Sequence, residues 1–265
     1  MMDSDLTALL RVTVEAAVSA GEILLEGGGQ AIASTSKERK HDLVTDFDRR
    51  SEDFLRTSLL TAEPTAGFLG EESGGSSLAE PFLWVVDPLD GTVNFAHGIP
   101  LYCVSIAAVM RGVPMIGVIH APALGETWTA IRGRGAHLGS RAIRVSSTEH
   151  LDDAMLVTGF PYDVADNPDG CINQFAAIVG KGLPVRRLGS AALDLAWVAA
   201  GRFDAFWEVR LQPWDMAAGV LLVEEAGGRI SHYGGRTFAL GTDSIIATNG
   251  RLHDELTMVL SESAR

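Results

Sequence analysis

The chain has 265 residues, which is enough to bury a large core as one domain or as two closely packed lobes. Its formal net charge of −13 disfavours nonspecific binding to nucleic acid or to an anionic membrane, because both depend on positive patches. It has no apolar run of the roughly 18 residues that a membrane-spanning helix needs, and its acidic N-terminus is unlike a secretory signal. We therefore expect a cytoplasmic protein.

The first elements in chain order are helices. Apolar residues at helical spacing predict a helix over 6–25, ended by the glycines at 27–29. Residues 34–41 are polar and basic and predict a mobile surface loop. A second helix is expected over 48–60, capped by Thr45 or Asp46. The two cysteines, Cys103 and Cys171, have apolar neighbours and no metal-ligand spacing, which indicates buried free thiols.

The segment over 82–95 carries the strongest chemical signal. Its apolar run over 82–86 predicts a buried strand, and Pro88 cannot donate to a ladder, so we expect pairing to stop there with Asp87 at the strand exit. Gly91 allows a close backbone approach, and Thr92 can begin a short helix whose N–H groups face an anion. Asp87 and Asp90 would hold divalent cations beside that anion. The same residue types are also common in ordinary turns, so this alternative stays open.

The rest of the chain divides into two patterns. Three apolar runs over 101–131, separated at 111–112 and 124–126, predict antiparallel strands. After Ser146, strands and helices alternate and predict an α/β lobe: strands over 154–158, 185–188, 205–208, 229–231 and 245–247, and helices over 173–179, 191–200 and 215–226. The expected lobes are residues 1–146, of α+β type, and residues 147–265, of α/β type, acting as one catalytic unit.

Further acidic residues lie beside expected element ends. They are Asp48, the pair Glu71 and Glu72, and Asp215 after Pro213 and Trp214. Each has an ordinary alternative: Asp215 can cap a helix, and the glutamates can be a solvated loop pair. No Ser/His/Asp or Cys/His nucleophile pattern and no phosphate-binding Gly-x-x-x-x-Gly-Lys loop stands out, which argues against covalent catalysis and nucleoside triphosphate hydrolysis.

Taken together, these segments resemble the ordered signatures of the inositol monophosphatase family. The similar segments are Asp-Leu-Val-Thr-x-x-Asp over 42–48, Gly-Glu-Glu-Ser over 70–73, Asp-Pro-Leu-Asp-Gly-Thr-Val-Asn-Phe over 87–95, Gly-Ser-Ala-Ala over 189–192 and Trp-Asp-Met-Ala-Ala-Gly over 214–219. The resemblance spans nearly the whole chain. It implies a layered α/β/α/β/α sandwich, a homodimer, and hydrolysis of a phosphate monoester by metal-activated water.

The resemblance also implies a set of metal ligands. Glu71, Asp87 and the carbonyl of Leu89 would hold one Mg²⁺, and Asp87, Asp90 and Asp215 a second, with a third, weaker ion near Glu71. Such ions would reverse the sign of an acidic pocket and activate water, so the negative charge of the chain and the metal hypothesis support each other. Li⁺ is expected to inhibit.

Catalytic and substrate roles follow from the same resemblance. Asp48 and Thr92 would orient the nucleophilic water, with Glu71 as a further catalytic group. Glu208 would accept a ring hydroxyl, although a surface glutamate is the alternative. Lys37 could lie near the metal entrance and His97 at the pocket mouth, but a solvated side chain is a ready explanation for each. The expected substrate-binding residues are Asp90, Gly91, Thr92, Gly189, Ser190, Ala191, Glu208 and Asp215.

The expected substrate is myo-inositol monophosphate, which the segments over 159–162 and 189–196 favour by resemblance. Fructose 1,6-bisphosphate, histidinol phosphate and 3′-phosphoadenosine 5′-phosphate are alternatives with the same chemistry. A regulatory binding protein on a phosphatase scaffold is an alternative of another class. No nucleic acid or membrane partner is expected.

Overall fold

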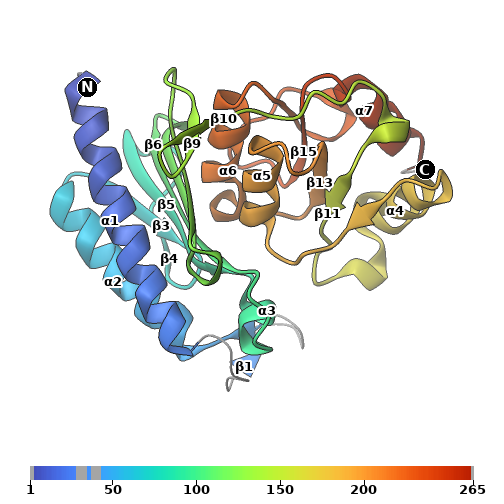
Figure 1. The fold of residues 1–265 in the computed structure, drawn as a ribbon. Coiled ribbons are helices and arrows are strands. Elements are labelled where there is room, and N and C mark those ends of the chain that lie inside the picture. The colour runs from blue at the N-terminus through green and yellow to red at the C-terminus, as the bar shows by residue number, and fades with distance from the viewer. Residues whose placement is uncertain (1–2, 28–34, 37–42, 264–265) are drawn as a thin grey trace.

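The computed structural model describes residues 3–27, 35–36 and 43–263. Its layers run helix, sheet, helix, sheet, helix (Figure 1), which confirms the expected α/β/α/β/α sandwich. The helices are α1 (Asp3–Gly27), α2 (Asp46–Ala62), α3 (Thr92–Ala96), α4 (Cys171–Gly180), α5 (Ala191–Ala199), α6 (Pro213–Glu225) and α7 (His253–Ser263). None of the helices in these ranges is long and apolar enough to cross a membrane.

The larger sheet has eight strands in the order β10-β9-β8-β7-β6-β5-β3-β4. Its neighbours are antiparallel except for β3 and β5, which are parallel. The expected meander over 101–131 is confirmed as β6, β7 and β8. The strands are β3 (Gly67–Gly70), β4 (Gly74–Gly75), β5 (Phe82–Asp90), β6 (Cys103–Met110), β7 (Val113–Ala121), β8 (Glu126–Ile131), β9 (Ala136–Leu138) and β10 (Arg141–Ile143).

The smaller sheet has five strands in the order β12-β11-β13-β15-β14. Strands β12, β11 and β13 are parallel, whereas β15 pairs antiparallel with both β13 and β14. The expected alternation after Ser146 is confirmed, each element lying within a few residues of its predicted place. The strands are β11 (Leu156–Thr158), β12 (Val185–Arg186), β13 (Ala205–Val209), β14 (Arg229–Ser231) and β15 (Ser244–Thr248).

Three apolar clusters hold the layers together, and alternate residues along a strand belong to different clusters. On β5, Trp84 and Val86 pack with α1 and α2, while Leu83 and Val85 face the central layer that contains α5 and α6. On β13, Phe206 faces the same central layer. Because side chains alternate along a strand, Asp87 and Glu208 are also directed toward the central layer. Carboxyl groups from both sheets therefore face the same central layer.

Several sequence expectations need correction. Pairing does not end at Pro88: β5 runs to Asp90, because a register shift between Asp87 and Asp90 skips the proline and Asp90 pairs with Cys103. The second helix begins at Asp46, two residues early, with Thr45 as its cap. Part of the expected loop forms β1 (Thr35–Ser36), which pairs with β2 (Leu43–Val44); the rest of that loop, including Lys37, lies outside the described residues.

Two further expectations are confirmed, and several elements were not predicted. Cys103 and Cys171 are both free and buried, as predicted. His97 is exposed, and its Nδ1 lies 2.8 Å from the carbonyl oxygen of Val93, which confirms the solvated alternative. The helix α7 and the strands β9 and β10 were not predicted.

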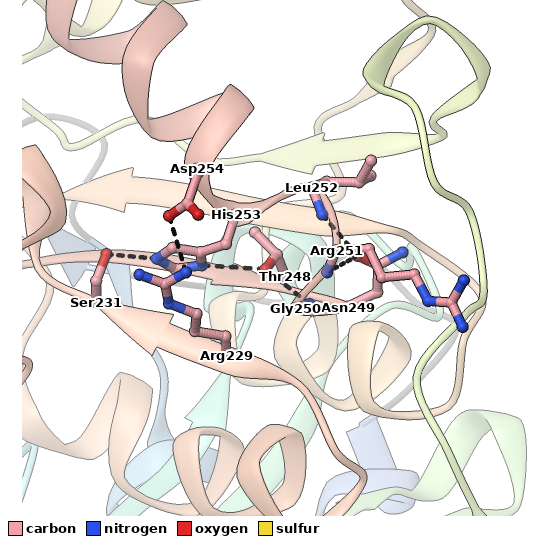
Figure 2. A network of polar contacts seen from close by, with 9 residues as sticks. All are labelled: Arg229, Ser231, Thr248, Asn249, Gly250, Arg251, Leu252, His253 and Asp254. Carbon is pink, nitrogen blue, oxygen red and sulfur yellow. Dashed lines mark hydrogen bonds and ion pairs between the residues drawn. The ribbon is translucent and has the colours of Figure 1, made fainter.

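A buried histidine joins α7 to the small sheet (Figure 2). The ring of His253 is fully buried, with Nδ1 3.0 Å from Thr248 Oγ1 and Nε2 2.9 Å from Ser231 Oγ. Beside it Arg229 pairs with Asp254 at 2.8 Å. Burial, reinforced by the charge of Arg229, lowers the pKa of His253 to about 4. The ring is thus held neutral between two hydroxyl groups.

We expect the protein to lose stability as the pH falls from about 6.5 to about 4. In this window the unfolded chain binds a proton at His253 and the folded protein does not, so the free energy of unfolding decreases by up to roughly 3 kcal/mol. Urea unfolding at pH 7 and pH 4.5 measures this loss. A His253→Gln variant should show a smaller loss, and a His97→Gln variant the full one; equal losses in all three would contradict the prediction.

Candidate active site

The site begins where β5 gives way to α3. Asp87 is 1 % exposed, and its Oδ1 accepts a hydrogen bond of 3.0 Å from the N–H of Leu89. Gly91 precedes α3 with φ of 97°, and a Cβ there would lie 2.8 Å from the carbonyl oxygen of Leu101. Both the conformation and the lack of space require glycine. The close approach predicted for Gly91 is therefore confirmed.

Thr92 connects this turn to the start of α2. Its hydroxyl lies 3.1 Å from Asp48 Oδ1 and 3.0 Å from the carbonyl oxygen of Leu89, so its single proton is donated to one of the two. Asp48 is fixed in a capping box, where Oδ2 accepts from the N–H of Thr45 at 2.7 Å and from its hydroxyl at 2.6 Å. Burial raises the pKa of Asp48, although the hydrogen bonds from Thr45 oppose the rise.

Four carboxyl groups lie within electrostatic reach of one another. Burial, followed by the charges of Glu71, Asp90 and Asp215, raises the pKa of Asp87 well above its usual range. Burial and then Asp90 do the same for Asp215. Asp215 lies in the first turn of α6, where its Oδ2 also accepts the N–H of Gln212 at 2.7 Å. It is thus both the N3 residue of a capping box, with Gln212 as the N-cap, and a member of the acidic group.

The fit to a divalent metal rests on the chemistry of these donors. Carboxylate and carbonyl oxygens suit hard cations such as Mg²⁺, and a cation would relieve the repulsion and desolvation that raise these pKa values. As the side chains stand, no group of three or more His, Cys, Asp or Glu residues in the described ranges is placed to hold a metal ion. The residues therefore fit a metal by donor type.

Helix α5 supplies the opposite wall. Ser190 is its N-cap, and the Ser190 hydroxyl donates to Asp90 Oδ2 at 2.6 Å, while the N–H of Ala192 donates to the same oxygen at 2.7 Å. Asn94 forms a second junction, because its Nδ2 donates to the carbonyl oxygens of Leu101 and Leu188, each at 2.7 Å. These contacts lock the β5–α3 turn against the start of α5.

Glu208 closes the far side of the site. It is 9 % exposed, and burial raises its pKa to about 8, with the charge of Arg187 opposing the rise. A Cβ added to Gly159 would lie 2.0 Å from a carboxylate oxygen of Glu208, so the glutamate occupies the space a side chain would fill. The surface-glutamate alternative for Glu208 is therefore wrong.

One cavity of about 610 Å³ joins these parts. It contains every expected site residue except Asp48, which lies behind Thr92 and reaches the cavity through the Thr92 hydroxyl. Glu71 lines the cavity and is half-buried, so the solvated-loop alternative does not describe it. The expected residues in the lining are Glu71, Asp87, Leu89, Asp90, Gly91, Thr92, Gly189, Ser190, Ala191, Glu208 and Asp215.

Comparison with known proteins identifies the family. The model of the inositol monophosphatase family matches residues 5–265. The chain belongs to the inositol monophosphatase family. It is 42 % identical over 259 residues to an inositol-1-monophosphatase of Synechocystis sp., covering 97 % of this chain and 90 % of that protein. It is also 44 % identical over 247 residues to the Nus factor SuhB of Pseudomonas aeruginosa, covering 91 % of each.

Solved structures agree with this assignment. The inositol monophosphatase of Anabaena (Nostoc) sp. superposes with a TM-score of 0.88 at 40 % identity, covering 98 % of this chain and 97 % of that one. The layered fold is that of inositol monophosphatases. As a member of this family, the chain is an enzyme that hydrolyses phosphate monoesters.

Among the cavity residues of this inositol monophosphatase to which the sequence analysis gave no individual role are Gly159, Arg187, Asp194 and Arg210. Asp194 is the most unusual, because it is 1 % exposed and neither carboxyl oxygen has a hydrogen-bond partner among the described residues. Burial, followed by the charges of Glu208 and Asp90, raises its pKa well above the usual range. An acidic residue inside an otherwise apolar helix, Ala191–Ala199, was the sequence signal available for it.

We expect Asp194→Asn to stabilise the metal-free enzyme at pH 8. At pH 8 the buried wild-type carboxyl group is either ionised without a partner or protonated although the solution favours its ionised form, and both states cost free energy. Asn carries no charge, so the free energy of unfolding should increase by at least about 1 kcal/mol. Because the folded-state pKa is raised, the difference should shrink toward pH 4. Urea unfolding in EDTA at both pH values measures it, with the exposed Asp152→Asn as control; a variant no more stable at pH 8 would contradict the prediction.

Proposed function

We propose that this phosphatase hydrolyses myo-inositol monophosphate to inositol and phosphate. The observation that carries the proposal is one cavity whose lining includes both the acidic residues at the end of β5 and, on its other side, the start of α5 and Glu208. The names of relatives such as the Synechocystis inositol-1-monophosphatase support the same substrate.

The proposed metal ligands are Glu71, Asp87, the carbonyl of Leu89, Asp90 and Asp215, which would hold two or three Mg²⁺ ions. Bound Mg²⁺ would supply a nucleophilic water of lowered pKa and neutralise charge on the phosphate and on the leaving oxygen. Asp90 Oδ2 already accepts hydrogen bonds from Ser190 and Ala192, so Oδ1 is the oxygen that would bind a metal. Inhibition by Li⁺ is part of this proposal.

The proposed water-positioning group is the pair of Asp48 and Thr92, with Glu71 as a further catalytic residue. When Thr92 donates its proton to Asp48 Oδ1, its Oγ1 keeps lone pairs that can accept a hydrogen bond from the attacking water. The capping box holds Asp48 still, so the orientation is set before substrate binds. The backbone N–H groups of Gly91 and Thr92 would hold the phosphate.

We assign recognition of the alcohol portion of the substrate to the start of α5 and to Glu208. Glu208 would accept a ring hydroxyl, and the backbone at Gly189, Ser190 and Ala191 would contact hydroxyl or phosphate oxygens. A buried acceptor left unpaired by an analogue that lacks the hydroxyl costs binding energy, so Glu208 would favour polyols. The metal ligands do not distinguish inositol phosphate from fructose 1,6-bisphosphate, histidinol phosphate or 3′-phosphoadenosine 5′-phosphate.

A regulatory role is the second candidate, favoured by the relative named Nus factor SuhB in Pseudomonas aeruginosa. In it the fold would serve as a scaffold for a partner. We further propose that the protein is a cytoplasmic homodimer, and that each chain consists of two lobes, residues 1–146 and 147–265. The contacts of Asp90 with α5 support a single catalytic unit made from both lobes.

The purified enzyme should release phosphate from myo-inositol 1-phosphate with Mg²⁺ and not with EDTA, and millimolar Li⁺ should inhibit. Asp87→Asn and Asp215→Asn should each lower kcat at least about 100-fold, because each removes a charge that the metal site needs. Circular dichroism would confirm that both variants fold, and Asp152→Asn is the control. Release unaffected by EDTA would contradict the metal proposal; a partner phenotype that survives both substitutions would favour the regulatory role.

Replacing Glu208 with Gln should lower kcat/KM for inositol phosphate more than for p-nitrophenyl phosphate, which has no ring hydroxyl for Glu208 to bind. The expected loss in kcat/KM for inositol phosphate exceeds that for the aryl ester by about tenfold, the value of one hydrogen bond to a charged group. Steady-state assays at pH 8, near the raised pKa of Glu208, measure both. Equal losses on the two esters would remove Glu208 from alcohol recognition.

A further inference from the structure

A second cavity lies in the outer helical layer over the smaller sheet, where α4 and α7 pack against each other (Figure 1). Its volume is about 530 Å³, and it is lined by residues of α4, of α7 and of two short 3-10 helices, η4 (Pro168–Gly170) and η5 (Tyr233–Gly235). None of its described lining residues also lines the active-site cavity. The second cavity is therefore a separate feature of the fold.

Helix α4 gives this cavity an amide oxygen without a partner. Gln174 lines the cavity and is 1 % exposed, and its Nε2 donates to the carbonyl oxygen of Asp169 at 3.1 Å. That bond fixes the orientation of the amide, because the flipped side chain would place two oxygens against each other. Gln174 Oε1 then has no hydrogen-bond partner among the described residues. A buried acceptor without a partner costs free energy, which a donor entering the cavity would recover.

The other helices around the cavity also contribute acceptors. The hydroxyl of Tyr233 is buried and has no hydrogen-bond partner in the part of the chain that the structure describes. Burial, followed by the charge of Glu208, raises the pKa of Tyr233 well above its usual range, so the group stays protonated and keeps lone pairs that can accept. Ser261 Oγ already donates to the carbonyl oxygen of Thr257 at 2.7 Å, so toward the cavity it can only accept.

Asp169 adds a negative charge to the same lining. Its side chain is about half exposed, and Oδ2 lies 3.7 Å from Arg210 Nε, which is beyond hydrogen-bond length. The carboxylate therefore keeps acceptor capacity for a ligand, and the net charge of −13 favours a cation. The described ranges hold no group of three or more His, Cys, Asp or Glu residues placed for a metal ion, so the charge and the acceptors suit an organic cation.

We propose that this second cavity binds a small aliphatic amine in its protonated form. An ammonium group carries three N–H donors and no acceptor, which matches the acceptors of Asp169, Gln174 and Tyr233. Leu260 and the ring of Tyr233 give the alkyl chain an apolar surface. The volume of about 530 Å³ is within the range of small-molecule sites. This inference goes beyond the proposed function and does not depend on it.

The probe is n-pentylamine, with 1-pentanol as its neutral counterpart, titrated at pH 7.5 with Mg²⁺ present and followed by NMR of the 15N-labelled protein. The N–H signals of Gly170 and Gly234 and the side-chain amide of Gln174 should shift together and saturate. The Kd for the amine should be at least about fivefold lower than that for the alcohol, because its hydrogen bonds are charge-assisted. The signals of Gly91 and Gly159, in the active-site cavity, should not follow this curve.

Two variants test the assigned groups. Asp169→Asn removes the charge and keeps the size, and asparagine tolerates the left-handed conformation of Asp169, whose φ is 51°. Tyr233→Phe removes only a hydroxyl without a partner, so we expect both variants to fold. Each should raise the Kd for pentylamine at least about fivefold. The control is Asp166→Asn, which makes the same charge change at an exposed neighbour outside the lining and should keep the wild-type Kd.

Several results would overturn the inference. They are no saturable shift up to about 50 mM pentylamine, equal affinity for the two probes, or a Kd that Asp169→Asn or Tyr233→Phe leaves unchanged. Shifts confined to Gly91 and Gly159 would place the amine among the carboxyl groups of the active site and would also overturn it. None of these outcomes bears on phosphate release, so the proposed function is tested separately.

Discussion

The cost of burying like charges is the constraint on which this enzyme's structure depends. Burial, followed by the charges of nearby carboxyl groups such as Asp90, raises the pKa of Asp87, Asp215, Asp194 and Glu208 and so favours their neutral forms. Hydrogen bonds from the backbone and from Ser190 offset part of that cost at Asp87 and Asp90. Such an arrangement is unfavourable for the isolated fold and persists where a function needs it. The large apolar core between and outside the two sheets supplies the stability that tolerates it.

The layered architecture delivers the carboxyl groups to one place by simple geometry. Alternation along β5 and β13 turns Asp87 and Glu208 toward the central layer, and helices α5 and α6 present their N-terminal turns there. Tight backbone approaches complete the arrangement: a Cβ at Gly91 or Gly159 would meet a carbonyl or a carboxylate. The site is therefore built from element ends that rigid strands and buried helices hold in place.

Much of this was readable from the sequence, and the failures have physical reasons. Apolar periodicity placed the strands and three of the helices after Ser146 within a few residues but missed α7, and the acidic segments indicated the site. The end of β5 was mispredicted because local chemistry at Pro88 says nothing about a bulge that resumes pairing at Asp90. Arg187 was missed because it lies outside the recognised segments, and Asp194 was given no role although it lies in the segment over 189–196, because the resemblance did not single it out. The significance of Asp194 depends on its burial and on the charge of Asp90, about 100 residues away in the sequence, which only the tertiary structure brings close.

The contact between Asp90 and α5 has a thermodynamic consequence. One oxygen of Asp90 accepts hydrogen bonds from Ser190 and Ala192, while the charge of the whole group acts on Asp87 and on Asp215. A cation bound to Asp90, as we propose, would weaken the hydrogen bonds that Asp90 accepts from the start of α5, and a ligand that moved α5 would in turn change the affinity for that cation. Because linkage is reciprocal, the two effects are equal in free energy. If Asp90 binds the metal as we propose, cation and substrate would be coupled through this single carboxyl group without any large motion of the lobes.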